Sequence, residues 1–256
     1  MSENANSDRL AAQLRAFTSA RVGLGRTGVS QQTRDVLDYQ LCHAQARDAV
    51  HSRIEAASLA AQLASIMGDC GRRNVEVLCL HSAAKDRTKY LQRPDLGRQL
   101  EERSRASIST MSGEYDVALM VADGLSALAV ERHAPPLLKE LLPRLQDWRL
   151  APLCIVEQGR VAIADEIGSA LGARISVILI GERPGLSSPD SLGAYITWAP
   201  QPGRTDAERN CISNIRAGGL SSAQAADQLN FYLTQSLRRN LTGVALKQGS
   251  HLLKEG

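Results

Sequence analysis

Three apolar runs in the second half of the chain each stop at a short loop that carries glycine or charge. The runs cover residues 115–121, 151–156 and 175–180, and a helix-like stretch follows the first two loops. Because helices cover both faces of a parallel sheet, its strands are apolar throughout, and ligands bind beyond their carboxyl ends. The sequence therefore predicts a parallel sheet with a ligand site in the loops after these runs.

Helical patterns fill most of the space between the runs. We expect a helix over residues 126–134, a second helix opened by Pro135-Pro136 and ending at Trp148, and a third over residues 161–171. A short strand at 194–198 and a long helix over 221–241, capped by Ser221 or Ser222, complete the chain. This strand–helix–strand series predicts an α/β fold, a Rossmann-like parallel sheet flanked by helices.

The first part of the chain has a different pattern. Residues 30–67 are almost free of glycine and proline, which predicts one long helix with at most one break, capped by Ser30 or Thr33. A short strand at 74–80 and a charged helix at 99–106 follow. We therefore divide the chain into a mainly helical N-terminal region, 1–110, and a Rossmann-like domain, 111–256.

Composition excludes several classes of protein. The net charge is only +3 among mixed-sign stretches, so the chain lacks the concentrated basic face of a nucleic-acid-binding protein. No apolar stretch is long enough to cross a membrane, and the polar start lacks the apolar core of a secretory signal. We expect a protein that stays inside the cell and binds neither nucleic acid nor membrane.

Cysteine and histidine patterns give no metal site. The five cysteines include no closely spaced pair, and the five histidines lack the short spacing of a chelating helix or turn. We expect most of the cysteines to be small buried side chains in a reducing compartment. Residues 211–216 are expected to form a short helical turn in which Cys211 is buried.

Two further motifs have competing interpretations. Gly23, Gly25 and Gly28 match a dinucleotide fingerprint, but the preceding residues make a poor strand, so a flexible loop that caps the next helix is favoured. Glu157 and Glu182 follow two of the apolar runs, and such a pair can act as acid and base. A carboxylate that accepts hydrogen bonds from a large cofactor is the favoured interpretation. No nucleophile-elbow motif follows any predicted strand, which disfavours a serine hydrolase.

Four segments together carry a resemblance to a known family. They are residues 121–127, 160–168, 179–186 and 211–215, in this order, and in them the chain resembles the small subunits of ethanolamine ammonia-lyase. The similarity is dense from about residue 115 to 219. It is weaker toward both ends, where residues 20–26 still resemble the family's early loop.

The resemblance implies a function. Members of this family belong to an adenosylcobalamin-dependent lyase that converts ethanolamine to acetaldehyde and ammonia by a radical route. The large subunit carries the substrate and the radical chemistry in a barrel, and the small subunit covers one side of the cobalamin with a Rossmann-like domain. The implied protein is therefore part of a hetero-oligomer of large and small subunits, cytoplasmic and within a bacterial microcompartment.

The resemblance also implies site residues. The family's cobalamin contacts fall on Val161, Glu182 and Cys211, with Arg160 as a weaker candidate, and no catalytic or metal-binding residue is implied on this chain. The motif by which some cobalamin proteins place a histidine on cobalt is missing from the sequence. A base-on cofactor is therefore expected.

Two alternatives from other classes stay open. One is a free-standing nucleotide-binding α/β protein, and the other is a purely structural interaction subunit. The apolar residues Leu10, Leu14 and Phe17 are expected either to dock on the large subunit or to direct packaging into the microcompartment.

Overall fold

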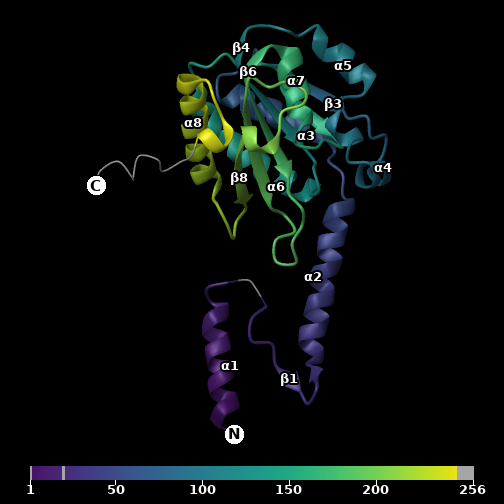
Figure 1. Cartoon of the computed structure of the whole chain (residues 1–256), viewed down its shortest axis with the longest axis vertical. Helices are drawn as coiled ribbons and strands as arrows, with labels where there is room; N and C mark the ends of the chain where they lie inside the picture. The colour runs from purple at the N-terminus through teal and green to yellow at the C-terminus, as the bar shows by residue number, and fades with distance from the viewer. Residues whose placement is uncertain (1, 19–20, 247–256) are drawn as a thin grey trace, which may run out of the picture.

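The computed structural model of the chain describes residues 2–18 and 21–246, and its centre is a six-stranded sheet in the order β3-β5-β4-β6-β7-β8 (Figure 1). Four strands run parallel: β3 (Val77–His81), β5 (Leu153–Glu157), β4 (Tyr115–Ala122) and β6 (Ala173–Gly181). The predicted α/β fold with a parallel sheet is confirmed for these four strands. Two antiparallel strands, β7 (Leu192–Trp198) and β8 (Arg209–Ile215), extend the sheet beyond β6. Because a loop rather than a helix joins β6 to β7, the chain returns in the opposite direction.

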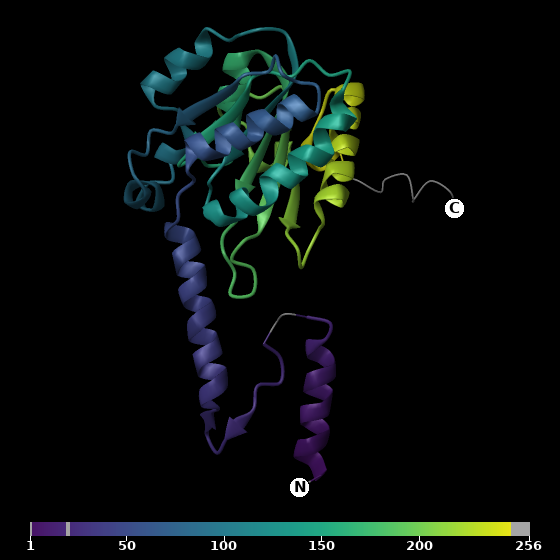
Figure 2. The ribbon, with the colours of Figure 1, turned by 180° about the vertical axis from the view of Figure 1, so that it is seen from behind.

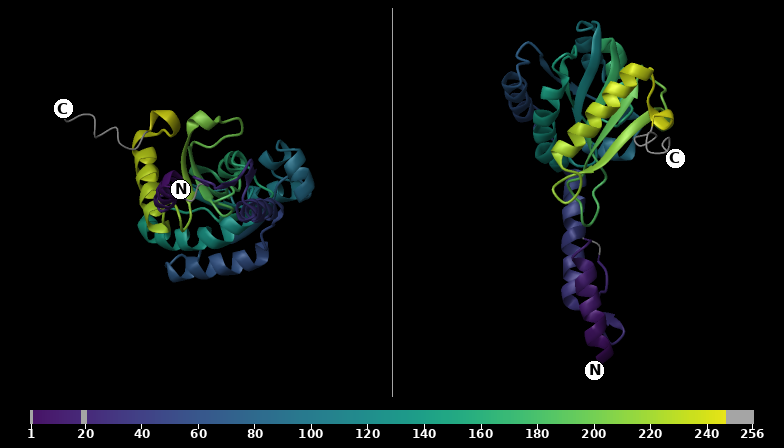
Figure 3. Two further views of the ribbon diagram at one scale, coloured as in Figure 1. Left: turned by 90° about the horizontal axis from the view of Figure 1, so that it is seen from below. Right: turned by 90° about the vertical axis from the view of Figure 1, so that its left-hand side faces the viewer.

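Helices cover both faces of the sheet. α3 (Ala56–Asp69), α6 (Ala127–Leu141) and α8 (Ser222–Arg239) lie on one face, and α5 (Glu102–Ser109) and α7 (Ile163–Leu171) lie on the other (Figures 2 and 3). Successive residues of β4 point into two different apolar clusters, Leu119 into the first and Met120 into the second. Burial on both faces explains why the central strands are apolar throughout.

The expected break between two helices at the proline pair is wrong. Pro135 and Pro136 lie inside the single helix α6, which then continues as a short 3-10 turn, Leu142–Leu145. A proline in a helix interior costs about 3 kcal/mol because it removes a backbone donor. Here Leu137, Leu138 and Leu141 are fully buried after the prolines, and this packing offsets the cost.

The helical turn expected around Cys211 is also wrong. Residues 209–215 form β8, where Arg209, Asn210, Ile212 and Ile215 are buried and Cys211 is exposed. Pairing with β7 decides the conformation, because each strand supplies the backbone partners that the other needs. The expectation that most cysteines are buried fails too, since among the five only Cys154 is buried and Cys79 is exposed like Cys211.

The N-terminal part projects from the sheet. α2 (Thr33–His51) extends away from the body, and α1 (Ser2–Arg15) lies at its far end (Figure 1). The predicted helix over residues 30–67 forms with one break, between α2 and α3. Its N-cap is Gln32, which makes no capping side-chain bond, so the expected cap at Ser30 or Thr33 is wrong.

The loop with the three spaced glycines is not a dinucleotide site. It contains a two-residue antiparallel pair, β1 (Arg26–Thr27) with β2 (Ser30–Gln31), and no strand of the central sheet lies in the described residues before it, 2–18 and 21–25. A fingerprint needs a strand before the glycines and a helix directly after them, so that the helix start meets a pyrophosphate. The match in spacing is therefore accidental.

Several elements before residue 110 join the main sheet. β3 is its edge strand, and Leu59, Leu63 and Met67 of α3 belong to the same core as α6 and α8. α4 (Arg87–Gln92) and the 3-10 turn Leu96–Arg98 lie between β3 and α5, while the turns Asp206–Glu208 and Gly243–Ala245 flank β8 and α8. A division of the chain at residue 110 remains a prediction. Within the described residues, no helix combines the length and the apolar character that a bilayer crossing requires.

Candidate functional site

A crevice of about 430 Å³ lies beyond the carboxyl ends of β4, β5 and β6. Each of the three predicted loops contributes to its lining: Gly124 and Leu125, Arg160 and Val161, and Gly181, Glu182 and Arg183, together with Tyr90, Ile180 and Tyr195. After β4 the chain turns to α6 on one face of the sheet, and after the adjacent β5 it turns to α7 on the other. Such a switch point opens a crevice between neighbouring strands, and ligands of α/β proteins bind there.

Glu182 is held at the edge of the crevice by its neighbours. Its carboxylate accepts hydrogen bonds from the Ser191 hydroxyl and, at 3.1 Å, from the backbone N–H of Asn214. Asn214 has a φ of 60° where the pairing of β7 and β8 shifts register, and this irregularity brings its N–H to Glu182. The side chain of Glu182 is half-buried, so it remains able to accept a hydrogen bond from a ligand.

Val161 and Arg160 lie on the opposite wall, between β5 and α7. The backbone N–H of Arg160 donates to the carbonyl of Gly97 at 2.7 Å, which fixes the loop against the 3-10 turn before α5. Val161 is half-buried and presents an apolar side chain beside the Arg160 guanidinium. This wall therefore offers both a cation and an apolar surface to a ligand.

Cys211 reaches this region through Tyr195. The two residues are register partners in β7 and β8, and Tyr195 lines the crevice. Burial, and then the neighbouring Cys211 thiol and Glu182 carboxylate, raise the pKa of the Tyr195 phenol. The structure thus brings Val161 and Glu182 together in one crevice and places Cys211 next to it, outside the direct lining.

Beneath Arg160 lies a buried polar layer that has no signal in the sequence. Tyr90 is fully buried, and the guanidinium groups of Arg87 and Arg160 lie 4.7 and 4.2 Å from its ring centroid. Arg87 is 3.5 Å from Asp123, which is buried and accepts from the Gly159 N–H. Burial raises the pKa of Asp123 to about 6 despite the Arg87 cation. These residues come from three separate parts of the chain, so no spacing rule could have grouped them.

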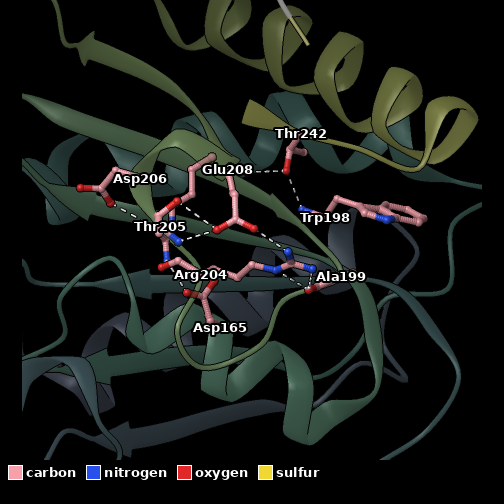
Figure 4. A network of polar contacts seen from close by, with 9 residues as sticks. Asp165, Trp198, Ala199, Arg204, Thr205, Asp206, Glu208 and Thr242 are labelled. Atoms are coloured by element: carbon pink, nitrogen blue, oxygen red, sulfur yellow. Dashed lines mark hydrogen bonds and ion pairs between the residues drawn. The ribbon is translucent and has the colours of Figure 1, made fainter. Parts of the chain in front are cut away.

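A second hollow, of about 910 Å³, adjoins the crevice and shares Arg160, Val161 and Tyr195 with it. The loop from β7 to β8 forms one of its walls and is tied together by polar contacts (Figure 4). The Glu208 carboxylate accepts from the N–H of Thr205 and from Arg204, and these bonds lower the pKa of Glu208 to about 2. Arg209 forms a buried ion pair with Asp165 of α7. This network joins α7, which follows Val161, to β8, which carries Cys211.

Glu157 and Glu182, the pair considered as acid and base, are not brought together. Glu157 ends β5, where it is paired in register with His81 of β3, whereas Glu182 follows β6. β4 lies between these strands, so the two carboxylates are separated by about 10 Å of sheet. Glu157 does not line the crevice. The geometry therefore supports the interpretation of Glu182 as an acceptor for a ligand.

Metal-binding and nucleophilic groups do not converge in the part of the chain that the structure describes. No group of three or more His, Cys, Asp or Glu residues is close enough to hold a metal ion there, and the crevice lining contains no histidine. His251 lies outside the described residues. The site combines donors, one carboxylate and apolar walls, which is the chemistry of a binding site for a large polar ligand.

Comparison with known proteins identifies the family. The model of the ethanolamine ammonia-lyase light chain family matches residues 8–247. The ethanolamine ammonia-lyase small subunit of Pseudomonas paraeruginosa is 56% identical over 241 residues, covering 91% of this chain and 85% of the relative. The small subunits of Azotobacter vinelandii and Ralstonia nicotianae are each 54% identical, covering 94% and 93% of this chain and 89% and 88% of the relatives. The predicted resemblance is confirmed, and the chain belongs to the ethanolamine ammonia-lyase light chain family.

Proposed function

We propose that this chain holds adenosylcobalamin against the large subunit of an ethanolamine ammonia-lyase, which converts ethanolamine to acetaldehyde and ammonia. The observation that carries the proposal is the crevice at the switch point of the sheet, where Val161 and Glu182 face one space and Cys211 adjoins it through Tyr195. The family to which the chain belongs supports the same function.

The chemistry of the crevice fits a cobalamin. The periphery of a corrin ring carries amide groups, and its nucleotide tail carries hydroxyl and phosphate oxygens. Glu182 can accept from N–H and O–H groups, Arg160 and Arg183 can donate to carbonyl and phosphate oxygens, and Leu125 with Val161 can pack against the ring edge. The Nε of Arg160 is buried without a hydrogen-bond partner in the described structure.

The size of the crevice implies a division of labour with the partner. At about 430 Å³ it is smaller than a cobalamin, so this chain would cover one side and the large subunit the other. When bound, the cofactor would supply a carbon radical by homolysis of its upper cobalt–carbon bond. The residues described here would bind and orient the cofactor and exclude water from one side of it. The base-on cofactor expected from the sequence would be held here by Glu182, Arg160 and Arg183 at its polar groups and by Leu125 and Val161 at its apolar edge.

The first test is ethanolamine deamination with adenosylcobalamin, using this chain alone, the large subunit alone and both together. We expect activity only in the mixture, because the crevice provides binding groups but no catalytic set. Activity or tight nucleotide binding by the isolated chain would favour the free-standing nucleotide-binding alternative. A competent large subunit that gains nothing from this chain would contradict the proposal.

A second test separates cofactor binding from a purely structural role. Glu182→Ala in the assembled enzyme removes one charge-assisted acceptor, and we expect about tenfold weaker cobalamin binding with assembly intact. Glu182→Gln keeps an acceptor for the Asn214 N–H and should lose less affinity. Glu157→Ala, at the end of β5 outside the crevice, is the matched control. Unchanged affinity in Glu182→Ala would favour the structural alternative.

The cellular setting follows from the same proposal. We propose a cytoplasmic hetero-oligomer of large and small subunits inside a bacterial microcompartment, which the family resemblance supports. Fractionation of cells that express a tagged chain measures this directly. Recovery of the chain with purified microcompartments, together with the large subunit, is the expected result, and recovery only from the free cytoplasm would contradict it.

A further inference from the structure

Arg160 lies where three hollows of the surface meet. It lines the crevice, the adjoining hollow of about 910 Å³, and a groove of about 560 Å³ between α2 and the loop after β6. Among the residues that the structure describes, no other lines all three. Arg160 therefore borders a ligand in the crevice whichever of the adjoining hollows that ligand extends into.

The orientation of this guanidinium depends on Tyr90. The Arg160 guanidinium lies 4.2 Å from the centroid of the Tyr90 ring, and its Nη2 donates to the Tyr90 carbonyl at 3.3 Å. The Tyr90 hydroxyl donates to the carbonyl of Gly159 at 3.0 Å, one residue before Arg160. Burial raises the pKa of Tyr90, so the phenol stays protonated as this donor. Tyr90 thus fixes both the backbone and the side chain of Arg160.

Tyr90 itself is held from below by Arg87. The Arg87 guanidinium lies 4.7 Å from the same ring centroid and donates to the carbonyls of Val50 and Gly124 at 2.7 and 2.9 Å. These contacts connect α2 and the loop after β4 to the layer under the crevice. Tyr90 therefore has little freedom to move away from Arg160.

Gly97 closes the layer from the side. A Cβ at this position would lie 2.8 Å from Cγ of Arg160 and 3.0 Å from Cε2 of Tyr90. The close approach of the backbone leaves the Arg160 side chain packed along the tyrosine ring. Arg160 is half-buried, and packing of this kind on several sides is the usual way to preorganise a ligand contact.

We propose that Tyr90 is a positioning residue that holds the Arg160 guanidinium at the crevice so that it donates to an oxygen acceptor on the cofactor. The acceptor is either an amide carbonyl of the corrin periphery or the phosphate of the nucleotide tail. This inference rests on the proposed function, since it takes cobalamin as the ligand.

The experiment is a double-mutant cycle on the enzyme assembled with its large subunit. The Kd of hydroxocobalamin is measured for Tyr90→Leu, Arg160→Met and the double variant, with Tyr90→Phe as the conservative variant. We expect Tyr90→Leu and Arg160→Met each to weaken binding about tenfold. The double variant should bind only slightly more weakly than either, because the two single changes remove the same contact with the cofactor. Tyr90→Phe keeps the ring and should recover most of the affinity lost in Tyr90→Leu.

Arg183 provides the matched control, because it also lines the crevice but has no contact with an aromatic ring among those described. Arg183→Met should combine additively with Tyr90→Leu. Additive effects of Tyr90→Leu and Arg160→Met would overturn the inference, and so would an unchanged Kd in Arg160→Met. Thermal unfolding and assembly of each variant show whether Tyr90→Leu weakens binding only by loosening the fold. If it does, the Kd of Tyr90→Phe, which keeps the ring, tests the positioning role instead.

A further arm with cobinamide separates the two possible acceptors. Cobinamide lacks the nucleotide tail, so Arg160→Met should weaken cobalamin but not cobinamide binding when the acceptor is the phosphate, and weaken both equally when it is an amide. If the unmodified complex binds no cobalamin, the proposed function fails. If Glu182→Ala weakens binding but Tyr90→Leu does not, only the positioning role fails.

Discussion

At the scale of single residues, the crevice depends on the close approach of two loops. Gly124 has a φ of 55°, and a Cβ there would lie 2.3 Å from the carbonyl oxygen of Gly181. The neighbouring Leu125 N–H donates to that same oxygen at 2.8 Å. Only a residue without a side chain allows both the conformation and the contact, so the loops after β4 and β6 meet directly.

Gly124→Ala is therefore expected to be strongly destabilising. It adds a backbone clash to the cost of a positive φ, and we expect a loss of at least about 3 kcal/mol in the free energy of unfolding, measured by urea denaturation. Gly71→Ala is the control, because Gly71 has a φ of 78° with open space around it. That variant should lose about 1 kcal/mol. Equal losses would show that the contact with Gly181 is not a constraint.

Asp123 is expected to make stability depend on pH. Its folded-state pKa is raised by burial to about 6, above the ordinary value of 3.8. As pH falls through 6, the folded state takes up a proton that the unfolded state does not yet bind, so this group makes the protein more stable toward pH 4. The contribution is at most about 3 kcal/mol and is lost as pH rises through 6.

Urea denaturation between pH 4.5 and 7.5 measures this dependence. Asp123→Asn keeps an oxygen acceptor for the Gly159 N–H but cannot titrate. The unfolding free energy of the wild type should therefore rise relative to that of the variant as the pH falls. A difference that stays constant with pH would show that Asp123 does not titrate in this range.

At the scale of secondary-structure elements, local signals predicted the elements whose ends carry their own capping groups. The side chain of Ser221 accepts from the N–H of Gln224, and the Gln224 side-chain oxygen accepts from the N–H of Ser221, as predicted for a cap at the start of α8. α7 ends at Gly172 in the left-handed conformation. β8 has no such signal. It is a strand because β7 lies beside it, and that neighbour is defined only by the fold.

Ser221→Ala should destabilise the chain by about 1 kcal/mol, because the N-terminal turn of α8 loses its capping acceptor. Thermal or urea unfolding measures the change. Ser222→Ala, at the next position inside the helix, should be neutral or slightly stabilising because alanine has the higher helix propensity. A Ser221 variant as stable as the Ser222 variant would show that neighbouring backbone groups or water replace the cap.

At the scale of the whole molecule, the projecting N-terminal part exposes apolar side chains. Leu10 and Leu14 of α1 are 57% and 49% exposed, and Leu37 and Leu41 of α2 are 58% and 57% exposed. In each helix the two leucines are four residues apart and therefore share a face. Apolar faces of this kind on a surface mark protein–protein contacts. The large subunit is the partner that the proposed function requires.

Replacing Leu37 and Leu41 with serine is expected to weaken association with the large subunit by about tenfold or more, while unfolding of the sheet region stays unchanged. Analytical ultracentrifugation of the mixed subunits measures the association. Gln40→Ser, an exposed polar change on the same helix, is the control. Unaltered association would leave packaging into the microcompartment as the role of this face, testable with the same variant in cells.

The amino-acid sequence by itself determined the parallel core of this protein and the three loops beyond it. Strands that are buried on both faces must be apolar throughout, and such runs are visible in the sequence together with the glycines and charges that end them. For the same reason the loops at 157–160 and 181–185 could be placed at one edge of the sheet, whereas Val161 was singled out by the family resemblance. Only the tertiary structure decided the continuous helix through Pro135 and Pro136, the strand that carries Cys211, and the layer of Arg87, Tyr90 and Asp123 under Arg160. These features depend on contacts between residues far apart in the chain, and a local pattern contains no information about such neighbours.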